Sequence, residues 1–225
     1  MTVLELPASY DRAGLMLRSV SEALARERTD LLLLPEAALT GYVSPTGDFD
    51  LTRFAEPLDG PLATECAHLA KRNQTHVVAP MVLREGEQLF NAINCFSPAG
   101  ETLFTYRKRH PWFPETWATP GENPLPLVEI AGKTITAAIC FDVHFLEAES
   151  AAQLEQADLL LFASAWVDDG PKPSLLPLLQ GLAKKFELYV ANANWGVGSP
   201  KIPGQGGSCI VDPRGRVLGS FAAIV

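Results

Sequence analysis

Short runs of apolar residues alternate along the chain with segments in which apolar residues recur every three or four positions. The run at residues 31–34 is continuous and ends at Pro35, which predicts a strand buried on both faces. Residues 13–24 carry apolar side chains on one helical face and charges elsewhere, so we predict a helix there. A second helix opens at Gly60-Pro61, because proline is favoured at the first helical position.

Further strands are predicted from short apolar runs bounded by polar residues, proline or glycine. They lie at residues 3–6, 76–83, 89–97, 102–106, 134–139, 159–163, 188–191 and 208–211, and a further helix lies at 175–187. A hairpin is expected at Pro98-Ala99-Gly100. No linker or repeat divides the chain, so residues 1–225 are expected to form one α/β domain with mixed β-sheet and outer helices.

The composition excludes several classes of protein. Hydrophobic residues make up 47% of the 225 residues and charged residues 20%, unlike a disordered or fibrous chain. Acidic residues outnumber basic ones by 26 to 18, giving a net charge of −8, so we expect no nucleic-acid partner. No apolar run approaches the ~18 residues of a membrane-spanning helix, and the N-terminus lacks the pattern of a signal peptide. We therefore expect a soluble, cytoplasmic protein without membrane contact.

The four cysteines are expected to act singly. Cys66, Cys95, Cys140 and Cys209 form no Cys-x-x-Cys pair, and the four histidines form no cluster at ligand spacing. We therefore predict neither a zinc site nor a disulfide framework, and no metal at the functional site.

Several unusual polar or aromatic residues come just after predicted strands. Glu36, Lys108 and Cys140 each follow one apolar run, and Trp166 and Asn192 follow two others. In open α/β sheets, ligands bind beyond the carboxyl ends of the strands. These side chains are therefore expected to converge on one pocket.

A glutamate, a lysine and a cysteine brought together form a defined chemical set. A free thiol has a pKa of about 8.5 and is mostly protonated at neutral pH. A carboxylate can remove its proton as general base, and a fixed ammonium with a backbone N–H can hold the oxyanion of a tetrahedral intermediate. From the residues alone, two other interpretations stay open: a Cys–His enzyme with His110 or His144 as base, and a binding or scaffold protein.

Three segments resemble the signature regions of the carbon–nitrogen hydrolase (nitrilase) superfamily, in the family's order. They are LLLLPEAALTGY, FTYRKRHPW and AAICFDVHFLE. The resemblance implies Glu36 as general base, Lys108 as oxyanion stabiliser and Cys140 as nucleophile, with the backbone N–H of Phe141 as a second oxyanion donor. It also implies an α-β-β-α sandwich, no cofactor, and a homodimer or higher homo-oligomer.

The loop that follows the lysine resembles that of the aliphatic amidase branch of the family. Its segment KRHPWFPETWATPG contains Glu115, to which the resemblance assigns the orientation of the lysine and of the substrate amide. Trp112, Trp166 and Asn192 are expected to bind the substrate. His144 stands where the family often carries arginine, and this departure bears on the substrate contacts of that turn.

Together these features predict a thiol hydrolase that cleaves the C–N bond of a small carboxamide through a cysteine thioester and releases ammonia. A nitrilase or an N-carbamoyl amide hydrolase with the same three residues is the alternative within the family, so the expected substrate is an amide or a nitrile. A catalytically idle binding or scaffold protein of the same fold is the alternative from another class. Relatives normally continue beyond the final Val-Leu-Gly turn, so we expect the C-terminal tail to be short or absent.

Overall fold

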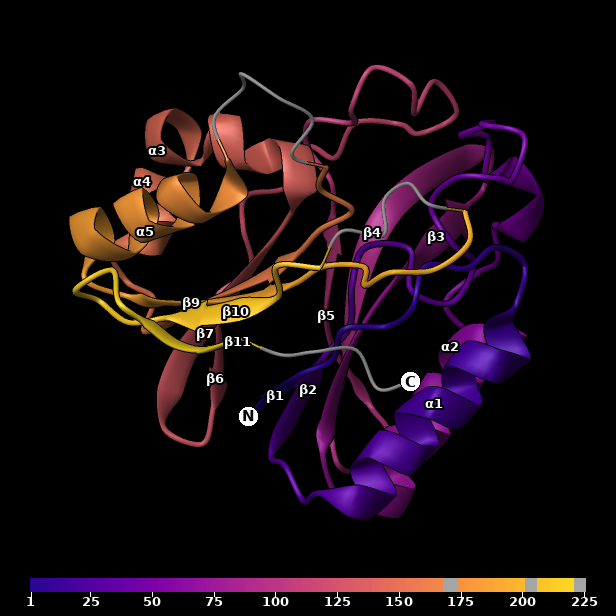
Figure 1. Cartoon of the computed structure of the whole chain (residues 1–225), viewed down its shortest axis with the longest axis horizontal. Helices are drawn as coiled ribbons and strands as arrows, with labels where there is room; N and C mark the ends of the chain where they lie inside the picture. The colour runs from indigo at the N-terminus through magenta and orange to yellow at the C-terminus, as the bar shows by residue number, and fades with distance from the viewer. Residues whose placement is uncertain (168–173, 201–205, 221–225) are drawn as a thin grey trace.

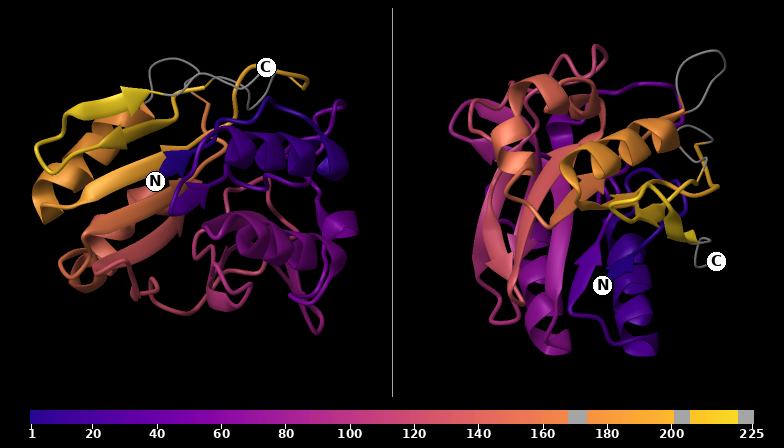
Figure 2. Two further views of the ribbon diagram at one scale, coloured as in Figure 1. Left: turned by 90° about the horizontal axis from the view of Figure 1, so that it is seen from below. Right: turned by 90° about the vertical axis from the view of Figure 1, so that its left-hand side faces the viewer.

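Two β-sheets lie face to face in the computed structural model, and helices cover their outer surfaces (Figure 1 and Figure 2). The structure describes residues 1–167, 174–200 and 206–220. One sheet is covered by α1 (Ala13–Arg26) and α2 (Pro61–Asn73), and the other by α3 (Leu146–Glu149), α4 (Ala151–Leu154) and α5 (Leu175–Phe186). The expected α-β-β-α sandwich is confirmed.

The first sheet contains five strands, which lie side by side in the order of the chain. They are β1 (Thr2–Val3), β2 (Leu31–Leu33), β3 (His76–Glu85), β4 (Gln88–Phe96) and β5 (Thr102–Arg107). β1, β2 and β3 pair in parallel, because α1 and α2 each carry the chain back between successive strands. β3, β4 and β5 pair antiparallel through short turns, the second of which is the expected hairpin. The 3-10 helix η1 (Thr52–Phe54) lies between β2 and α2.

Within the described residues, the second sheet contains six strands. They are β6 (Val128–Ile130), β7 (Lys133–Ile139), β8 (Leu159–Ala163), β9 (Tyr189–Ala193), β10 (Cys209–Val211) and β11 (Val217–Ser220). β7, β8 and β9 pair in parallel, and the outer strands pair antiparallel. The 3-10 helix η2 (Cys140–His144) begins where β7 ends, so the chain turns sharply at the cysteine.

Strand β2 is buried on both of its faces, as the continuous apolar run predicts. Leu31 and Leu33 belong to the core that also contains Leu161 of the second sheet, so they fill the space between the sheets. Leu32 and Leu34 point the other way and pack in a second core beneath α1 and α2. This strand therefore joins the two hydrophobic layers of the protein.

The strands and helices that the hydrophobic pattern predicted lie within a few residues of the observed ones. Pattern alone indicated one mixed sheet, whereas the strands are divided between two. The pattern did not predict β6 or β11, because segments of three or four residues carry too little periodicity.

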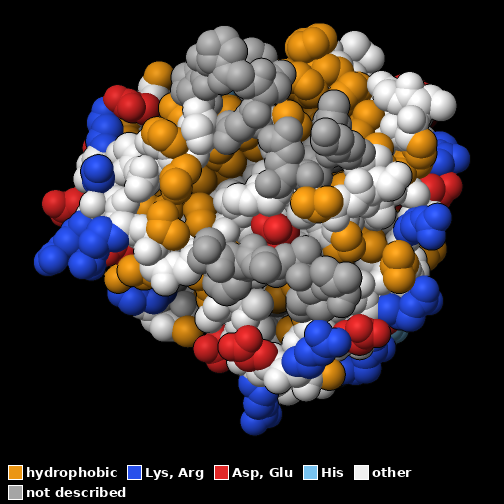
Figure 3. Space-filling model, viewed as in Figure 1, with side chains coloured by type: hydrophobic (Ala, Val, Ile, Leu, Met, Phe, Trp, Pro, Cys, Tyr) orange, Lys and Arg blue, Asp and Glu red, His pale blue; other side chains and the backbone are white. Residues whose placement is uncertain are grey.

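On the face seen in Figure 3, acidic side-chain atoms are visible near the centre, but most charged side chains lie around the margin. Lys and Arg side chains are interspersed there with Asp and Glu, and they do not gather into one basic surface on the described part of this face. No helix in the described ranges is both long and apolar enough to span a bilayer.

Replacing Leu33 by alanine tests the core between the two sheets. Leu33 is fully buried, so Leu33→Ala should lower the free energy of unfolding by about 2–5 kcal/mol. Leu218 on β11 is 58% exposed, and Leu218→Ala should change the same quantity by less than about 0.5 kcal/mol. Urea denaturation followed by circular dichroism measures both. Equal losses in the two variants would contradict the assignment of Leu33 to the central core.

Candidate active site

Four side chains predicted to be functional lie buried together where the two sheets meet. Glu36 follows β2, Lys108 follows β5, Glu115 lies in the loop after β5, and Cys140 follows β7. Their exposed fractions are 0%, 1%, 3% and 7%, in that order. Glu36 and Lys108 therefore follow strands of the first sheet, whereas Cys140 follows a strand of the second. The arrangement of the site thus depends on how the two sheets pack against each other.

Lys108 donates hydrogen bonds to two carboxylates. Its Nζ lies 2.7 Å from Glu36 Oε1, and 2.8 and 3.0 Å from the two oxygens of Glu115. Burial alone would lower the pKa of Lys108, but the negative charges of Glu36 and Glu115 raise it, and the net shift is upward. Lys108 is therefore held as an ammonium ion.

The two oxygens of Glu36 have different surroundings. Oε1 accepts hydrogen bonds from Lys108 and, at 2.7 Å, from the side-chain amide of Asn91. Oε2 is buried and accepts no hydrogen bond from any described residue. Burial raises the pKa of Glu36 from 4.5 to about 7, with Lys108 opposing and Glu115 reinforcing the shift. Such a carboxyl group can exchange a proton near neutral pH through its unpaired oxygen.

Glu115 is surrounded by hydrogen-bond donors. Besides Lys108, its Oε1 accepts the hydroxyl of Tyr42 at 2.6 Å and the amide of Asn91 at 3.3 Å, and its Oε2 accepts the backbone N–H of Trp112 at 3.2 Å. Burial and the nearby carboxylates raise the pKa of Tyr42 well above its usual value, so its hydroxyl remains a donor. Glu115 is thus fixed in place, whereas Glu36 keeps one oxygen free.

Tyr42 and Asn91 were not predicted from the sequence as parts of the site. Tyr42 closes the first signature segment, but a tyrosine there also fits simple core packing. Asn91 is the more informative case, because an amide within the buried strand β4 must find polar partners. A search for buried polar residues inside apolar runs, rather than only after them, would have found it.

Cys140 occupies a strained turn between β7 and η2. Its φ of 41° lies in the left-handed region, which non-glycine residues adopt at a cost and which occurs often at functional sites. Burial and the charge of Glu36 raise the pKa of its thiol well above the usual value, although Lys108 and the backbone N–H of Ala165 oppose the shift. The resting thiol is therefore protonated and needs a base before it can react as a nucleophile.

The backbone of Glu36 is held by residues of the opposite sheet. Its N–H donates to the carbonyl of Ser164, just after β8, at 3.3 Å. Its carbonyl accepts the indole N–H of Trp195, just after β9, at 2.8 Å. Trp195 is fully buried, so the second sheet fixes the position of a residue that the first sheet supplies.

The predicted substrate-binding residues differ in their surroundings. Trp112 is half-buried, with its ring edge-to-face against Phe49 at 5.5 Å. Trp166 is half-buried, with its ring 5.7 Å from that of His144. Asn192 is completely buried, and its amide is already bonded to the hydroxyl of Ser164 and the carbonyl of Gly207. This arrangement gives no support to a substrate contact by Asn192.

Neither candidate histidine base is hydrogen bonded to Cys140. The ring of His110 stacks on Phe145 at 3.8 Å and contacts Glu149 at 3.0 Å. The ring of His144 packs against Phe141 at 5.0 Å. Both histidine rings contact other partners, whereas the charge of Glu36 acts on the Cys140 thiol, which favours the glutamate over a Cys–His pair. Among the described residues, no three His, Cys, Asp or Glu side chains lie together in a group that could hold a metal ion.

The chain is similar to known hydrolases over most of its length. The family model for carbon-nitrogen hydrolases matches residues 9–222. A Pseudomonas protegens protein described as a hydrolase in the pqqF 5' region is 30% identical over 93% of this chain and 73% of its own. An (R)-stereoselective amidase of Pseudomonas sp. is 29% identical over 84% of this chain and 68% of its own.

A solved structure supports the same relationship. A cysteine-to-alanine mutant of the Nesterenkonia AN1 amidase, from the nitrilase superfamily, superposes with a TM-score of 0.83 at 26% identity, covering 98% of this chain and 85% of its own. A glutamate-to-glutamine mutant of that amidase, at 25% identity and a TM-score of 0.82, carries acrylamide added to its active-site cysteine. This chain belongs to the carbon–nitrogen hydrolase family, and it is a carbon–nitrogen hydrolase.

Proposed function

We propose that this enzyme hydrolyses a small carboxamide through a thioester on Cys140 and releases ammonia. The observation that carries the proposal is the buried cluster beside the thiol. In that cluster one ammonium bridges two carboxylates, and only Glu36 keeps an oxygen without a hydrogen bond from any described residue. A protonated thiol, a base with a pKa of about 7 and a fixed cation are the three parts that amide cleavage by cysteine requires.

Glu36 is the general base in this proposal. Its charge raises the pKa of the buried Cys140 thiol, so the two groups lie close enough to interact electrostatically. Glu36 Oε2 takes the thiol proton while the sulfur attacks the carbonyl carbon of the amide. The C=O π bond breaks, a C–S bond forms, and the negative charge moves to the carbonyl oxygen.

Lys108 and the backbone N–H of Phe141 receive that oxyanion. An ammonium group has three N–H donors. One is directed to Glu36, and one can be shared between the two closely spaced oxygens of Glu115, which leaves the third for the substrate oxygen. A cation fixed before the reaction stabilises the developing charge without reorganisation during the step.

The tetrahedral intermediate then collapses to a thioester. The protonated Glu36 returns its proton to the amide nitrogen, the C–N bond breaks, and ammonia leaves. Glu36 next removes a proton from water, the hydroxide oxygen attacks the thioester carbonyl, and the carboxylic acid is released as Glu36 returns the proton to the Cys140 sulfur. One residue thus moves protons in both halves of the reaction.

Glu115 positions Lys108 in this mechanism. All the donors around it are supplied by the protein, and they leave it fixed rather than available as a base. The amidases among the relatives support an amide over a nitrile substrate, and the acrylamide adduct in one of them supports a nucleophilic cysteine.

Substituting each glutamate by glutamine separates their two roles. Glu36→Gln should slow the hydrolysis of amides and of esters alike by at least ~10²–10⁴-fold, because the proton carrier is lost for every substrate. Glu115→Gln should slow amides more than activated esters, because the base remains and only the placement of Lys108 is impaired. Steady-state rates on a matched amide and p-nitrophenyl ester measure the amide-to-ester ratio in each variant.

Two results would count against these roles. If Glu115→Gln slows esters and amides equally, the positioning role is wrong. If a nitrile or an N-carbamoyl compound is turned over and no carboxamide is, the enzyme is the corresponding nitrilase or carbamoylase. A folded wild type that acts on none of these would favour an idle scaffold.

The dependence of kcat/KM on pH tests the state of Glu36. Its pKa is raised from 4.5 to about 7, so below pH 7 it is protonated and cannot accept the thiol proton. For an uncharged amide, kcat/KM should therefore rise with pH along a limb with an apparent pKa near 7. A limb near 4.5, with full activity at pH 6, would show that the base is not a Glu36 carboxylate whose pKa is raised by burial.

A further inference from the structure

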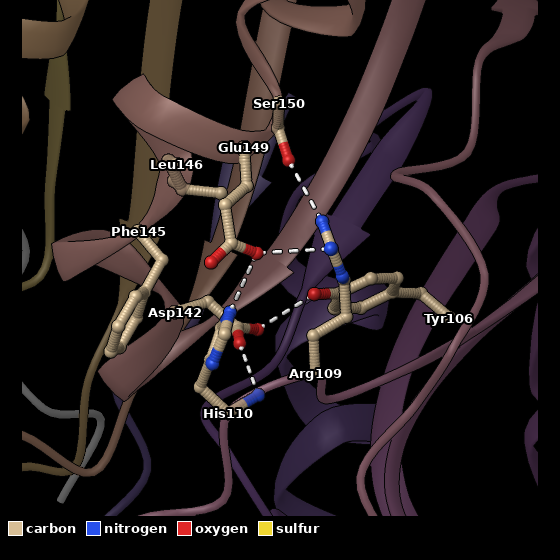
Figure 4. Close-up of a pocket in the computed structure, with 8 residues that line it drawn as sticks. All are labelled: Tyr106, Arg109, His110, Asp142, Phe145, Leu146, Glu149 and Ser150. Carbon is tan, nitrogen blue, oxygen red and sulfur yellow. Dashed lines mark hydrogen bonds and ion pairs between the residues drawn. The ribbon is translucent and has the colours of Figure 1, made fainter.

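The carboxylate of Asp142, two residues after Cys140, lies buried beside the candidate active site. It belongs to the small pocket drawn in Figure 4, which is lined by side chains from residues 106–110, a segment that begins in β5, and from residues 142–150, which follow β7. The oxygen atoms of Asp142 point at partners on the first of these segments, as the dashed lines in Figure 4 show.

Asp142 accepts three hydrogen bonds. Oδ2 accepts the hydroxyl of Tyr106 at 2.8 Å and the backbone N–H of Ile139 at 3.1 Å. Oδ1 accepts the backbone N–H of His110 at 2.9 Å. Each donor is itself in a segment that carries a residue of the proposed mechanism.

The positions of these donors in the chain show which two segments the Asp142 carboxylate connects. Tyr106 and His110 stand two residues before and two residues after Lys108, and Ile139 directly precedes Cys140. Lys108 follows a strand of the first sheet and Cys140 a strand of the second, so no hydrogen-bond ladder sets the distance between them. Asp142 supplies direct bonds between the two segments at this point.

A second set of contacts joins the same segments nearer the surface. Glu149 of α3 contacts Arg109 at 2.9 Å and His110 at 3.0 Å, and Arg109 also reaches Ser150 at 3.4 Å. The side chains of Arg109, His110 and Glu149 are 25–34% exposed, so water weakens the contacts between them. Asp142 is the buried connection, and it fixes the geometry more firmly.

We propose that Asp142 is a positioning residue for hydrolysis, which holds the Lys108 segment and the Cys140 turn at the separation that places both oxyanion donors on one substrate oxygen. This inference rests on the proposed function. The donors concerned are Lys108 Nζ and the N–H of Phe141, which lies between Cys140 and Asp142 in the turn. Loss of the connection should impair the stabilisation of the oxyanion and leave the thiol and its base in place.

Asp142→Asn tests this inference with little change of shape. The amide cannot accept all three bonds, because one of its two terminal atoms is a donor. Acylation of Cys140 by p-nitrophenyl acetate should fall ~10–100-fold, through kcat rather than KM, because misplacement of catalytic groups by about 1 Å has effects of this size. Alkylation of the thiol by iodoacetamide forms no oxyanion and should keep its rate.

Two further variants serve as control and second test. Asp158→Asn makes the same change just before β8, where the carboxylate accepts the Thr134 N–H at 2.8 Å and a Lys133 N–H at 3.0 Å, and it should alter neither rate. Tyr106→Phe removes one donor from Asp142 and keeps the carboxylate. It should reduce the rate of acylation by at least about three-fold and leave the rate of alkylation unchanged. If Asp142→Asn does not fold, this variant tests the positioning role of Asp142 in its place.

Equal acylation rates in wild type and Asp142→Asn would overturn the inference, as would equal losses of acylation and alkylation in a folded variant. In the absence of a folded Asp142→Asn, an unchanged acylation rate in Tyr106→Phe would overturn it. Failure of the wild type to hydrolyse any carboxamide would contradict the proposed function instead, because the ester and alkylation rates still report on Asp142.

Discussion

A lysine ammonium buried between two carboxylates is the interaction on which the site depends. Moving a single charge out of water costs several kcal/mol, so Lys108 can be buried only together with Glu36 and Glu115. These residues come from separate parts of the chain and meet only when the first sheet is formed and the loop after β5 is in place. Neutral donors from Tyr42, Asn91 and the Trp112 backbone satisfy most of the remaining oxygen sites.

The surroundings of the two glutamates make the same residue type suitable for different work. Glu115 is held by donors on both oxygens and supports the cation. Glu36 accepts hydrogen bonds from Lys108 and Asn91 on one oxygen, and its other oxygen accepts none from the described residues. Burial raises its pKa to about 7, so it can take and return a proton. In the proposed mechanism, the unequal distribution of hydrogen bonds, rather than the distance to Lys108, therefore distinguishes the general base from the carboxylate that positions the lysine.

The sequence was most informative where burial and polarity conflict. Glu36, Lys108 and Cys140 each stand at the end of an apolar run, and that position alone indicated a common pocket. The same rule selected Asn192, whose amide is used within the fold, because a strand-end position does not reveal which partners are already present. Tyr42, Asn91 and Asp142 were not selected, since their importance arises from side-chain partners 24 to 73 residues away. The continuous apolar run likewise predicted both buried faces of β2, but the pattern did not predict the division of the strands between two sheets.

The most direct test of the mechanism is the mass of the enzyme during turnover. Wild-type protein mixed with a panel of small carboxamides and activated esters is quenched in acid, and intact and peptide masses are measured alongside the ammonia released. We expect an added acyl group on the peptide that contains Cys140, ammonia release from at least one carboxamide, and neither result in Cys140→Ala. Undiminished ammonia release by Cys140→Ala, or acylation of Cys66, Cys95 or Cys209 in place of Cys140, would contradict a thioester mechanism at this site.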